Sequence, residues 1–315
     1  MSFSHEVKGE LSRKEITKKC CMLAEISGFI RMAGSVKLIG EGKIAISIST
    51  ENPAIARHYK KLIKNYFNVV GTLEIEDSIN PRKVNAHTYS ITISPEQKSE
   101  RILRETGILL IREGNDYIAE GIDYTILKSK CCKKAYLRGA FLATGTISDP
   151  LKSYHLEFVM RSEALAKDLK KLTGQFYDLE ANIVERNNEY VVYMKKAGYI
   201  SDFLGIVGAD VSLMNFLNIK IERGMKKEAQ RLSNCDNANV DRAIMAADKE
   251  INDIKKIEEN KGLESLPKSL IRVAELRLQY PVASLTEIGE MLEPKIKKAA
   301  VSKKFKKIHE IAKET

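Results

Sequence analysis

The chain has 315 residues, of which 43% are hydrophobic, and a formal net charge of +10 at pH 7. This length and composition indicate two or three globular domains with ordinary cores. No apolar run approaches the roughly 18 residues that favour a membrane span, and the polar start of the chain lacks a signal-peptide core, so we expect a cytoplasmic protein with no membrane partner.

The sequence lacks the short motifs of metalloenzymes and nucleotide-binding enzymes. It contains no H-E-x-x-H, no P-loop and no G-x-G-x-x-G after a predicted strand. Its five cysteines form two adjacent pairs, Cys20-Cys21 and Cys131-Cys132, and a lone Cys235, with no C-x-x-C. We interpret the paired cysteines as structural thiols, with a zinc site as the alternative. The sequence therefore predicts no metal, no cofactor and no small-molecule substrate.

The first long predicted element is an apolar segment that occurs twice. Lys19 to Gly34 aligns with Lys130 to Gly145, 111 residues later, and 6 of the 16 aligned positions are identical. Average residue usage gives about one such identity by chance. The identical pairs are Lys19/Lys130, Cys20/Cys131, Cys21/Cys132, Ala24/Ala135, Gly28/Gly139 and Gly34/Gly145. The chain is therefore predicted to contain a duplicated unit.

Each copy carries two glycines six residues apart, Gly28 with Gly34 and Gly139 with Gly145. Because glycine in a helix costs about 1 kcal/mol relative to alanine, a glycine pair at equivalent positions indicates close helix packing or a helix end. Alternating strand-like sequence and helical segments follow each copy. The predicted strands are 43–48, 69–76, 87–94, 154–159, 182–185 and 190–194, and the predicted helices are 52–66 and 163–176.

The two glycine-bearing runs, Gly28 to Gly34 and Gly139 to Gly145, resemble the motif of the LAGLIDADG homing endonucleases. The resemblance implies two units that meet through these helices and present a curved sheet to a DNA duplex. In the family's nucleases the residue before the final glycine is a carboxylate that binds the catalytic metal. Here those positions are Ala33 and Thr144, which cannot replace a pair of Mg²⁺ ligands, so we expect no catalytic residues.

An enzyme alternative stays open at this point. A nuclease could recruit its metal through other carboxylates, such as Glu25, Glu51 or Glu163. Metal-dependent cutting of a plasmid would distinguish the two hypotheses.

The joint between the two halves of the chain is predicted at Leu232 to Asn239, because this segment holds a cluster of polar residues typical of a turn. Helical sequence resumes at Val240 and continues to Glu259, and a break follows from Lys261 to Pro267. The predicted fold is α+β. A duplicated LAGLIDADG-like domain spans residues 1–230, with repeats at about 15–110 and 127–220, and an all-helical domain spans 231–315.

The end of the chain shows helix start and stop signals in close succession. A helix is predicted over 268–279, and Tyr280-Pro281 interrupts it because proline disfavours helical geometry in the preceding residue. Ser284 and Glu287 form the pattern of a capping box before a short helix, 285–292. A second helix is predicted over 298–313, burying Val301, Phe305 and Ile308. These signals predict a helix-turn-helix at about 284–309.

The predicted second helix is strongly basic on its polar face. Residues 295–315 contain eight lysines and two glutamates, a formal charge of +6, which is the footprint of a phosphate-binding module. We expect polar groups near the helix start to face base edges and the lysines to contact phosphates. The candidate DNA-binding residues are Ser284, Thr286, Lys297, Lys298, Ser302, Lys303, Lys306 and Lys307.

Across its length the chain resembles the WhiA family of bacterial DNA-binding regulators. The matching features include Ser2-Phe3-Ser4 at the start, the run 137–142, Asp149-Pro150 and Asn234-Cys235. The resemblance implies a role in transcriptional control linked to cell division and chromosome segregation, and to sporulation in filamentous relatives. Many members carry Ser-Gly-Val-Asn-His-Arg where this chain has residues 299–304, so the family's DNA target is not carried over.

The leading hypothesis is a non-catalytic, nucleoid-associated regulator that binds double-stranded DNA through its C-terminal helices. Transcription machinery or other regulators are further expected partners. The third hypothesis is a partner-recruited interaction protein with weak DNA binding, which would be captured by its partners even after nuclease treatment.

Overall fold

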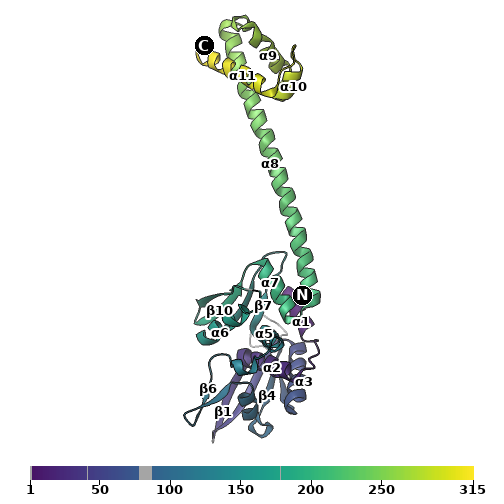
Figure 1. Cartoon of the computed structure of the whole chain (residues 1–315), viewed down its shortest axis with the longest axis vertical. Helices are drawn as coiled ribbons and strands as arrows, with labels where there is room; N and C mark the ends of the chain where they lie inside the picture. Colours follow the sequence, from purple (N-terminus) through teal and green to yellow (C-terminus); the bar gives the residue numbers. More distant parts are fainter. Residues whose placement is uncertain (1, 41, 78–86, 178) are drawn as a thin grey trace. The chain divides into compact units, whose positions relative to one another are not determined.

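A computed structural model describes residues 2–40, 42–77, 87–177 and 179–315 of the chain. It divides into two compact units, Met1–Arg223 and Gly224–Thr315, which are coloured purple to teal and green to yellow in Figure 1. One long helix, α8 (Asp210–Lys261), contributes its first residues to the first unit and the remainder to the second. Each unit is considered by itself below.

The first unit is built from two copies of one helix and sheet arrangement. Helices α2 (Lys19–Ala33) and α5 (Lys130–Thr144) lie 111 residues apart, as the repeat predicts. Each is followed by a four-stranded antiparallel sheet, with orders β1-β2-β4-β3 and β7-β8-β10-β9. The strands are β1 (Gly34–Gly40), β2 (Lys43–Thr50), β3 (Thr72–Asp77), β4 (His87–Ile93), β7 (Gly145–Ile147), β8 (Leu156–Met160), β9 (Asn182–Arg186) and β10 (Glu189–Met194). The predicted α+β class and the duplication are confirmed.

Helices cover the sheets, and shorter elements link the two copies. The covering helices are α3 (Pro53–Phe67), α6 (Glu163–Thr173) and α7 (Ala197–Val207). The other elements of this unit are α1 (Phe3–Leu11), η1 (Pro95–Gln97), α4 (Ser99–Glu105), β5 (Leu109–Arg112), β6 (Asn115–Ile118) and η2 (Tyr124–Ile126). Amphipathic spacing explains the packing of α1, which buries Phe3, Val7 and Leu11 at helical intervals against the core that both copies share.

The two repeat helices touch backbone to backbone at equivalent glycines. A Cβ atom on Gly28 would lie 2.5 Å from the Tyr136 carbonyl oxygen, and a Cβ on Gly139 would overlap the Glu25 carbonyl oxygen. Glu25 and Tyr136 are themselves repeat-equivalent, so the contact has two-fold pseudosymmetry. Helices can approach this closely only where no side chain separates their backbones. The glycines that the repeat singled out therefore sit at the centre of the unit.

The second unit is all-helical. The last part of α8 packs with α9 (Lys268–Gln279), α10 (Leu285–Glu290) and α11 (Lys298–Lys313), and η3 (Leu263–Ser265) precedes α9. Helices α9 and α11 have the predicted bounds, whereas α10 ends two residues earlier than predicted, although Leu292 is still buried. The core consists of Ile254, Ile257, Leu266, Leu270, Val273, Ala274, Leu276, Ile288, Leu292, Val301, Phe305, Ile308 and Ala312.

The turn predicted at Leu232 to Asn239 is wrong, and so is the new helix start at Val240. Helix α8 runs without interruption through this segment. The polar side chains are exposed on the helix surface, where Gln230 donates to Asn234 at 2.9 Å and Arg242 to Asn239 at 3.3 Å. No glycine or proline occurs between Gly224 and Gly262, so nothing forces the backbone to leave the helix. Local turn propensity was overridden by uninterrupted helical hydrogen bonding.

We predict that Gly139→Ala lowers the stability of the first unit by about 1–3 kcal/mol, because the added Cβ pushes α5 away from α2. Thermal or urea unfolding of the full chain measures the effect. The control is Gly9→Ala in α1, where a Cβ meets nothing within 4 Å and alanine favours the helix. Equal stability of the two variants would show that the helices can separate without cost.

Candidate nucleic-acid interface

The start of α10 is fixed by a capping box. The Ser284 hydroxyl accepts a hydrogen bond from the Glu287 backbone N–H at 3.2 Å, and the Glu287 carboxylate accepts one from the Ser284 N–H at 2.7 Å. The backbone and side-chain donors of Ser284 lower the pKa of Glu287, which keeps its carboxylate charged. This arrangement confirms the predicted helix start and satisfies two N–H groups that the helix cannot pair by itself.

The tight connection between α10 and α11 depends on Gly289. The Ile296 N–H donates to the Gly289 carbonyl at 3.0 Å, and a Cβ on Gly289 would overlap the Ile296 carbonyl oxygen. Buried Ile288, Leu292 and Val301 fill the space between the two helices. The segment 291–297 therefore folds back against α10, which gives the short helix, turn and second helix of a helix-turn-helix.

Arg277 supports the loop that leads into this motif, a role that no sequence pattern indicated. Its side chain is 2% exposed and pairs with Glu250 of α8 at 2.9 Å. It also donates to the carbonyls of Pro281 at 3.3 Å and Ala283 at 2.5 Å, and lies over the Phe305 ring of α11. Burial raises the pKa of Glu250, and the nearby Arg277 opposes this shift only in part. One guanidinium thus connects α8, α9, α11 and the loop before Ser284.

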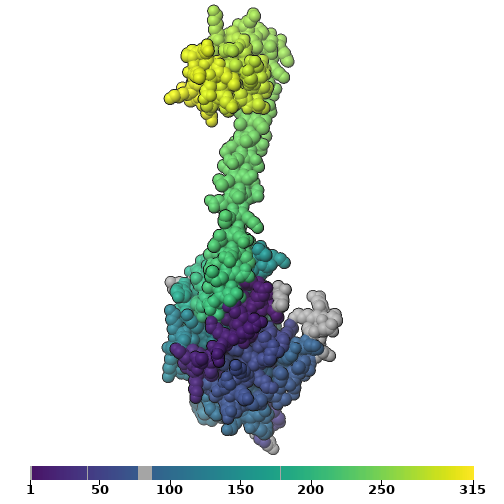
Figure 2. All heavy atoms as spheres, turned by 90° about the vertical axis from the view of Figure 1, so that its right-hand side faces the viewer, coloured from purple at the N-terminus to yellow at the C-terminus, as the bar shows by residue number. Residues whose placement is uncertain are grey.

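The predicted DNA-binding side chains lie on the outer side of this motif. All of them are exposed except Ser302, which is half-buried. In α11, Ser302, Lys303 and Lys306 follow one another at helical spacing, opposite the buried Val301, Phe305 and Ile308. Figure 2 shows the C-terminal residues, in yellow, covering part of the surface of the second unit. Lys304 lies apart from this face, because its ammonium donates to the Ser269 carbonyl at 2.8 Å.

In the first unit, Ala33 and Thr144 lie where the two repeat helices end. Both line a pocket of about 630 Å³ together with Ser35 and Arg161. The equivalent positions in the two helices thus come together, as the motif requires, but they present a methyl group and a hydroxyl group. The Thr144 hydroxyl is buried and has no hydrogen-bond partner among the residues that the structure describes.

Comparisons with known proteins match both units to domains of one family. Residues 19–109 match the model of the WhiA N-terminal LAGLIDADG-like domain, 133–226 that of the WhiA LAGLIDADG-like domain, and 229–312 that of the WhiA C-terminal HTH domain. The chain is 39% identical to a probable cell division protein WhiA of Alkaliphilus metalliredigens over 312 residues, covering 99% of this chain and 98% of that protein. It is 41% identical to the corresponding protein of Clostridium perfringens over 314 residues, covering 100% and 98%. This chain belongs to the WhiA family.

A crystal structure agrees with the family assignment. Full-length DUF199/WhiA from Thermatoga maritima superposes with a TM-score of 0.60 at 27% identity, covering 100% of this chain and 99% of that one. The order of elements predicted from the repeat and from the C-terminal helix signals is therefore that of a full-length WhiA protein. None of the described helices combines the length and apolar composition that a bilayer crossing requires.

The three carboxylates that could hold a metal in a nuclease, Glu25, Glu51 and Glu163, are dispersed in this WhiA chain. Glu25 of α2 is fully buried and pairs with Arg138 of α5 at 2.5 Å and with His58 of α3 at 2.8 Å. Glu163 begins α6 and pairs with Lys167 at 2.8 Å, and Glu51 lies against another pocket, of about 730 Å³. Glu25 thus contributes to a buried ion cluster that joins the two repeats, a role that the sequence did not reveal.

The face of the first sheet that lies opposite the core carries few cations among its described residues. In the first sheet, the core-facing positions are Val36, Ile44, Ile46, Ile48, Leu73, Ile91 and Ile93. The opposite face carries Ser35, Lys37, Lys43, Ser47, Ser49, Thr72, Glu74, Glu76, Ser90 and Thr92, of which Ser47 and Ser90 are buried. Hydroxyl and carboxylate groups therefore outnumber the lysines on this face. Such a surface has less attraction for phosphates than the lysine-rich surface of α11.

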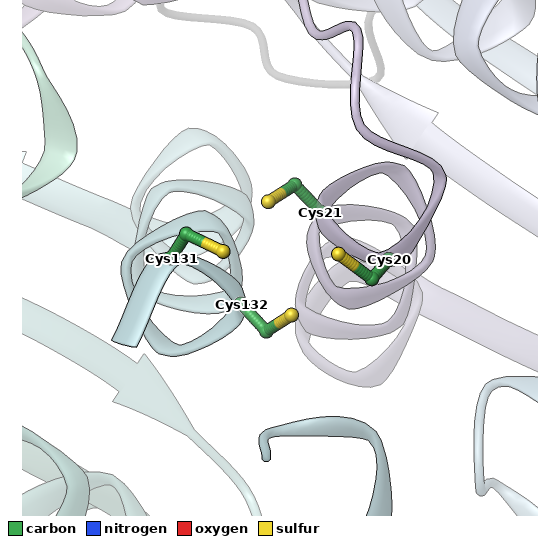
Figure 3. Close-up of side chains that lie close together, drawn as sticks. All are labelled: Cys20, Cys21, Cys131 and Cys132. Atoms are coloured by element: carbon green, nitrogen blue, oxygen red, sulfur yellow. The ribbon is translucent and has the colours of Figure 1, made fainter. Parts of the chain in front are cut away.

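One group of metal-ligating side chains stands out among the described residues. Cys20, Cys21, Cys131 and Cys132 place their four sulfur atoms within 4.8 Å of one another, between the first turns of α2 and α5 (Figure 3). From the sequence, adjacent cysteines in apolar, repeat-equivalent places favour structural thiols over a zinc site, and the two pairs lie 111 residues apart. The helix packing brings them together.

We predict that Arg277→Leu destabilises the second unit by about 3 kcal/mol, since Glu250 would stay buried without its partner. Chemical denaturation of the full chain, followed by circular dichroism, measures the loss. The matched control is Arg272→Leu, which breaks an exposed pair with Glu275 and should cost under about 1 kcal/mol. A similar small loss for both would mean that Arg277 does not hold the motif.

Proposed function

We propose that this protein is a DNA-binding transcriptional regulator that acts in cell division, with the second unit as its DNA reader. The observation that carries the proposal is the exposed row of lysines on α11, next to a capped α10, in a segment that matches the WhiA C-terminal HTH domain. Relatives at about 40% identity over their full length bear the name probable cell division protein. Both observations support one function.

The proposed binding mode places α11 in the major groove. The half-buried Ser302 and the exposed Lys303 lie near its start and are proposed to meet base edges. Lys297, Lys298, Lys306 and Lys307, together with the hydroxyls of Ser284 and Thr286, are proposed to contact the phosphate backbone. Because 295–315 contains no arginine, α11 offers point charges instead of bidentate donors, which favours affinity over base discrimination.

Finer roles follow from the family resemblance and belong to the same proposal. They are control of genes for chromosome segregation, a link to sporulation in filamentous relatives, residence on the nucleoid, and contacts with transcription machinery or other regulators. Genome-wide occupancy in the native host tests them: discrete peaks near such genes support these roles, and diffuse occupancy contradicts them.

The first unit is proposed to be a platform without nuclease activity. Ala33 and Thr144 supply no carboxylate at the ends of the repeat helices, and Glu25 is held in an internal ion cluster. The hydroxyl- and carboxylate-rich face of the first sheet favours docking of a protein partner over binding of a polyanion. This same face is the observation that favours the second candidate, a regulator recruited through a protein partner.

We predict that Lys303→Glu combined with Lys306→Glu weakens binding to double-stranded DNA by about 100-fold or more at physiological salt, because two phosphate-facing cations become anions. Fluorescence anisotropy with a labelled duplex measures the affinity. The control, Lys61→Glu with Lys64→Glu on the exposed face of α3, makes the same change in net charge in the other unit. Equal weakening by both pairs would show an effect of net charge alone.

The salt dependence of the same assay tests the number of phosphate contacts. If about six lysines meet phosphates, the logarithm of the affinity should fall with the logarithm of salt concentration with a slope near −5. The Lys303/Lys306 variant should show a slope shallower by about 2. An unchanged slope would remove these two lysines from the interface.

We predict that the purified protein leaves a supercoiled plasmid intact in Mg²⁺ or Mn²⁺. The variant Ala33→Asp with Thr144→Asp should also fail to cut readily, since cleavage needs the DNA backbone placed to within about 1 Å of the metals. Metal-dependent cutting by the natural chain, abolished by changing Glu51 or Glu163, would establish the nuclease alternative.

A further inference from the structure

The four cysteines form one cluster from two distant parts of the chain. Cys20 and Cys21 belong to the first turn of α2, and Cys131 and Cys132 to the first turn of α5. Figure 3 shows the four side chains in the space between the two helices, two from each. All four sulfurs lie within 4.8 Å of one another, and no disulfide joins them. The cluster is independent of the helix-turn-helix and of the proposed DNA contacts.

The spacing of the sulfurs suits a single metal ion. Zinc bound by four thiolates has Zn–S distances of about 2.3 Å, so a tetrahedral site places its sulfurs roughly 3.8 Å apart. Small rotations of the side chains would bring four sulfurs within 4.8 Å into that arrangement. An iron–sulfur cluster needs cysteines farther apart, because irons and bridging sulfides occupy the space between them.

Structural thiols explain the cluster less well. Buried cysteines pack as small apolar groups, but Cys20 is exposed and Cys131 is only half-buried. A single disulfide would join only two of the four sulfurs, and the two disulfides that could join all four are absent, because all four cysteines are free thiols in the structure. A tetrahedral ion instead uses every member of the cluster, and four cysteines are a donor set that selects zinc.

Two helix ends and nearby cations offset part of the negative charge that such a site would carry. The first turns of two helices direct the positive ends of their dipoles toward the sulfurs. Cys21 and Cys131 line a pocket of about 360 Å³ whose wall also includes Lys18 and Lys134, so an ion has a route of entry lined with compensating cations. The Ser129 hydroxyl lies 3.1 Å from the Cys131 sulfur and 2.9 Å from that of Cys132, within reach to orient both.

We propose that Cys20, Cys21, Cys131 and Cys132 bind one zinc ion that clamps the two repeats together at the start of their paired helices. Four thiols lose four protons to solvent as Zn²⁺ binds, which leaves a site with a net charge of −2. The ion stabilises the pairing of α2 and α5, because its four bonds join segments 111 residues apart. The proposed site departs from the expectation, drawn from the sequence, that the chain binds no metal.

Metal titration of the full chain tests the proposal. The reduced protein is stripped with a chelator, titrated with zinc and analysed for bound metal, with Mg²⁺ as the comparison ion. The test variant is Cys20→Ser with Cys131→Ser, which changes the two more accessible sulfurs and leaves the buried pair in the core. The control is Cys235→Ser, which removes the exposed cysteine of α8. Circular dichroism confirms that both variants are folded.

The expected result is one zinc ion per chain for the natural protein and for Cys235→Ser, and at least a tenfold loss of zinc affinity in the double variant. Zinc should raise the Tm of the natural chain and leave that of the double variant unchanged. Replacement by Co²⁺ should give the absorption bands of tetrahedral cobalt thiolate, absent from the double variant. DNA affinity in the anisotropy assay is measured in parallel, so failure of the metal site is distinguishable from failure of the proposed function.

Three outcomes would overturn the proposal. The first is a reduced natural chain that takes up no zinc, and the second is equal zinc binding by the double variant. The third is the finding that two of the four cysteines form a disulfide in the purified protein while all metal is absent and added zinc leaves the Tm unchanged after reduction. If the double variant fails to fold, the single variant Cys20→Ser, at an exposed site, replaces it with the same expectations.

Discussion

The close contact of α2 and α5 is the constraint on which the first unit depends. At Gly28 and Gly139 each helix places its backbone where a side chain would otherwise stand, and the reciprocal carbonyls of Tyr136 and Glu25 occupy that space. This approach fixes what lies at both ends of the helix pair. It collects four cysteines at the start and brings Ala33 and Thr144 to the shared pocket at the finish. The glycines explain why a duplicated chain folds around one core instead of two.

The first unit keeps the packing of a LAGLIDADG fold, with Ala33 and Thr144 where the nuclease motif has carboxylates. Packing requires small residues along the helix contact, and these are retained at Gly28 and Gly139. The helix ends need carboxylates only for metal-assisted cleavage, so Ala33 and Thr144 can occupy them without cost to the fold. The buried pair of Glu25 and Arg138 adds a charged contact between the two repeats, and its desolvation is offset by His58 and by the Val207 carbonyl.

In the second unit, a small core holds the short helix α10 against the basic helix α11. Gly289 permits the close return of the chain, and the buried Arg277 adds bonds to a carboxylate and to backbone carbonyls beside the small core. The cost of placing lysines on the surface of α11 is low because they face solvent and repel one another only weakly through it. A packed core beneath exposed lysines suits the proposed contact with phosphates.

The sequence by itself determined the features that depend on local pattern. The repeat gave α2 and α5, apolar periodicity gave α9 and α11 with their bounds, and Ser284 with Glu287 gave the start of α10, because these signals act within a few turns of chain. Tertiary structure decided the rest. The continuity of α8 through polar residues, the pairing of Arg277 with Glu250 and the meeting of two cysteine pairs all depend on groups that come together only when distant segments pack. No local pattern records such a contact, since its energy arises from desolvation and geometry across the fold.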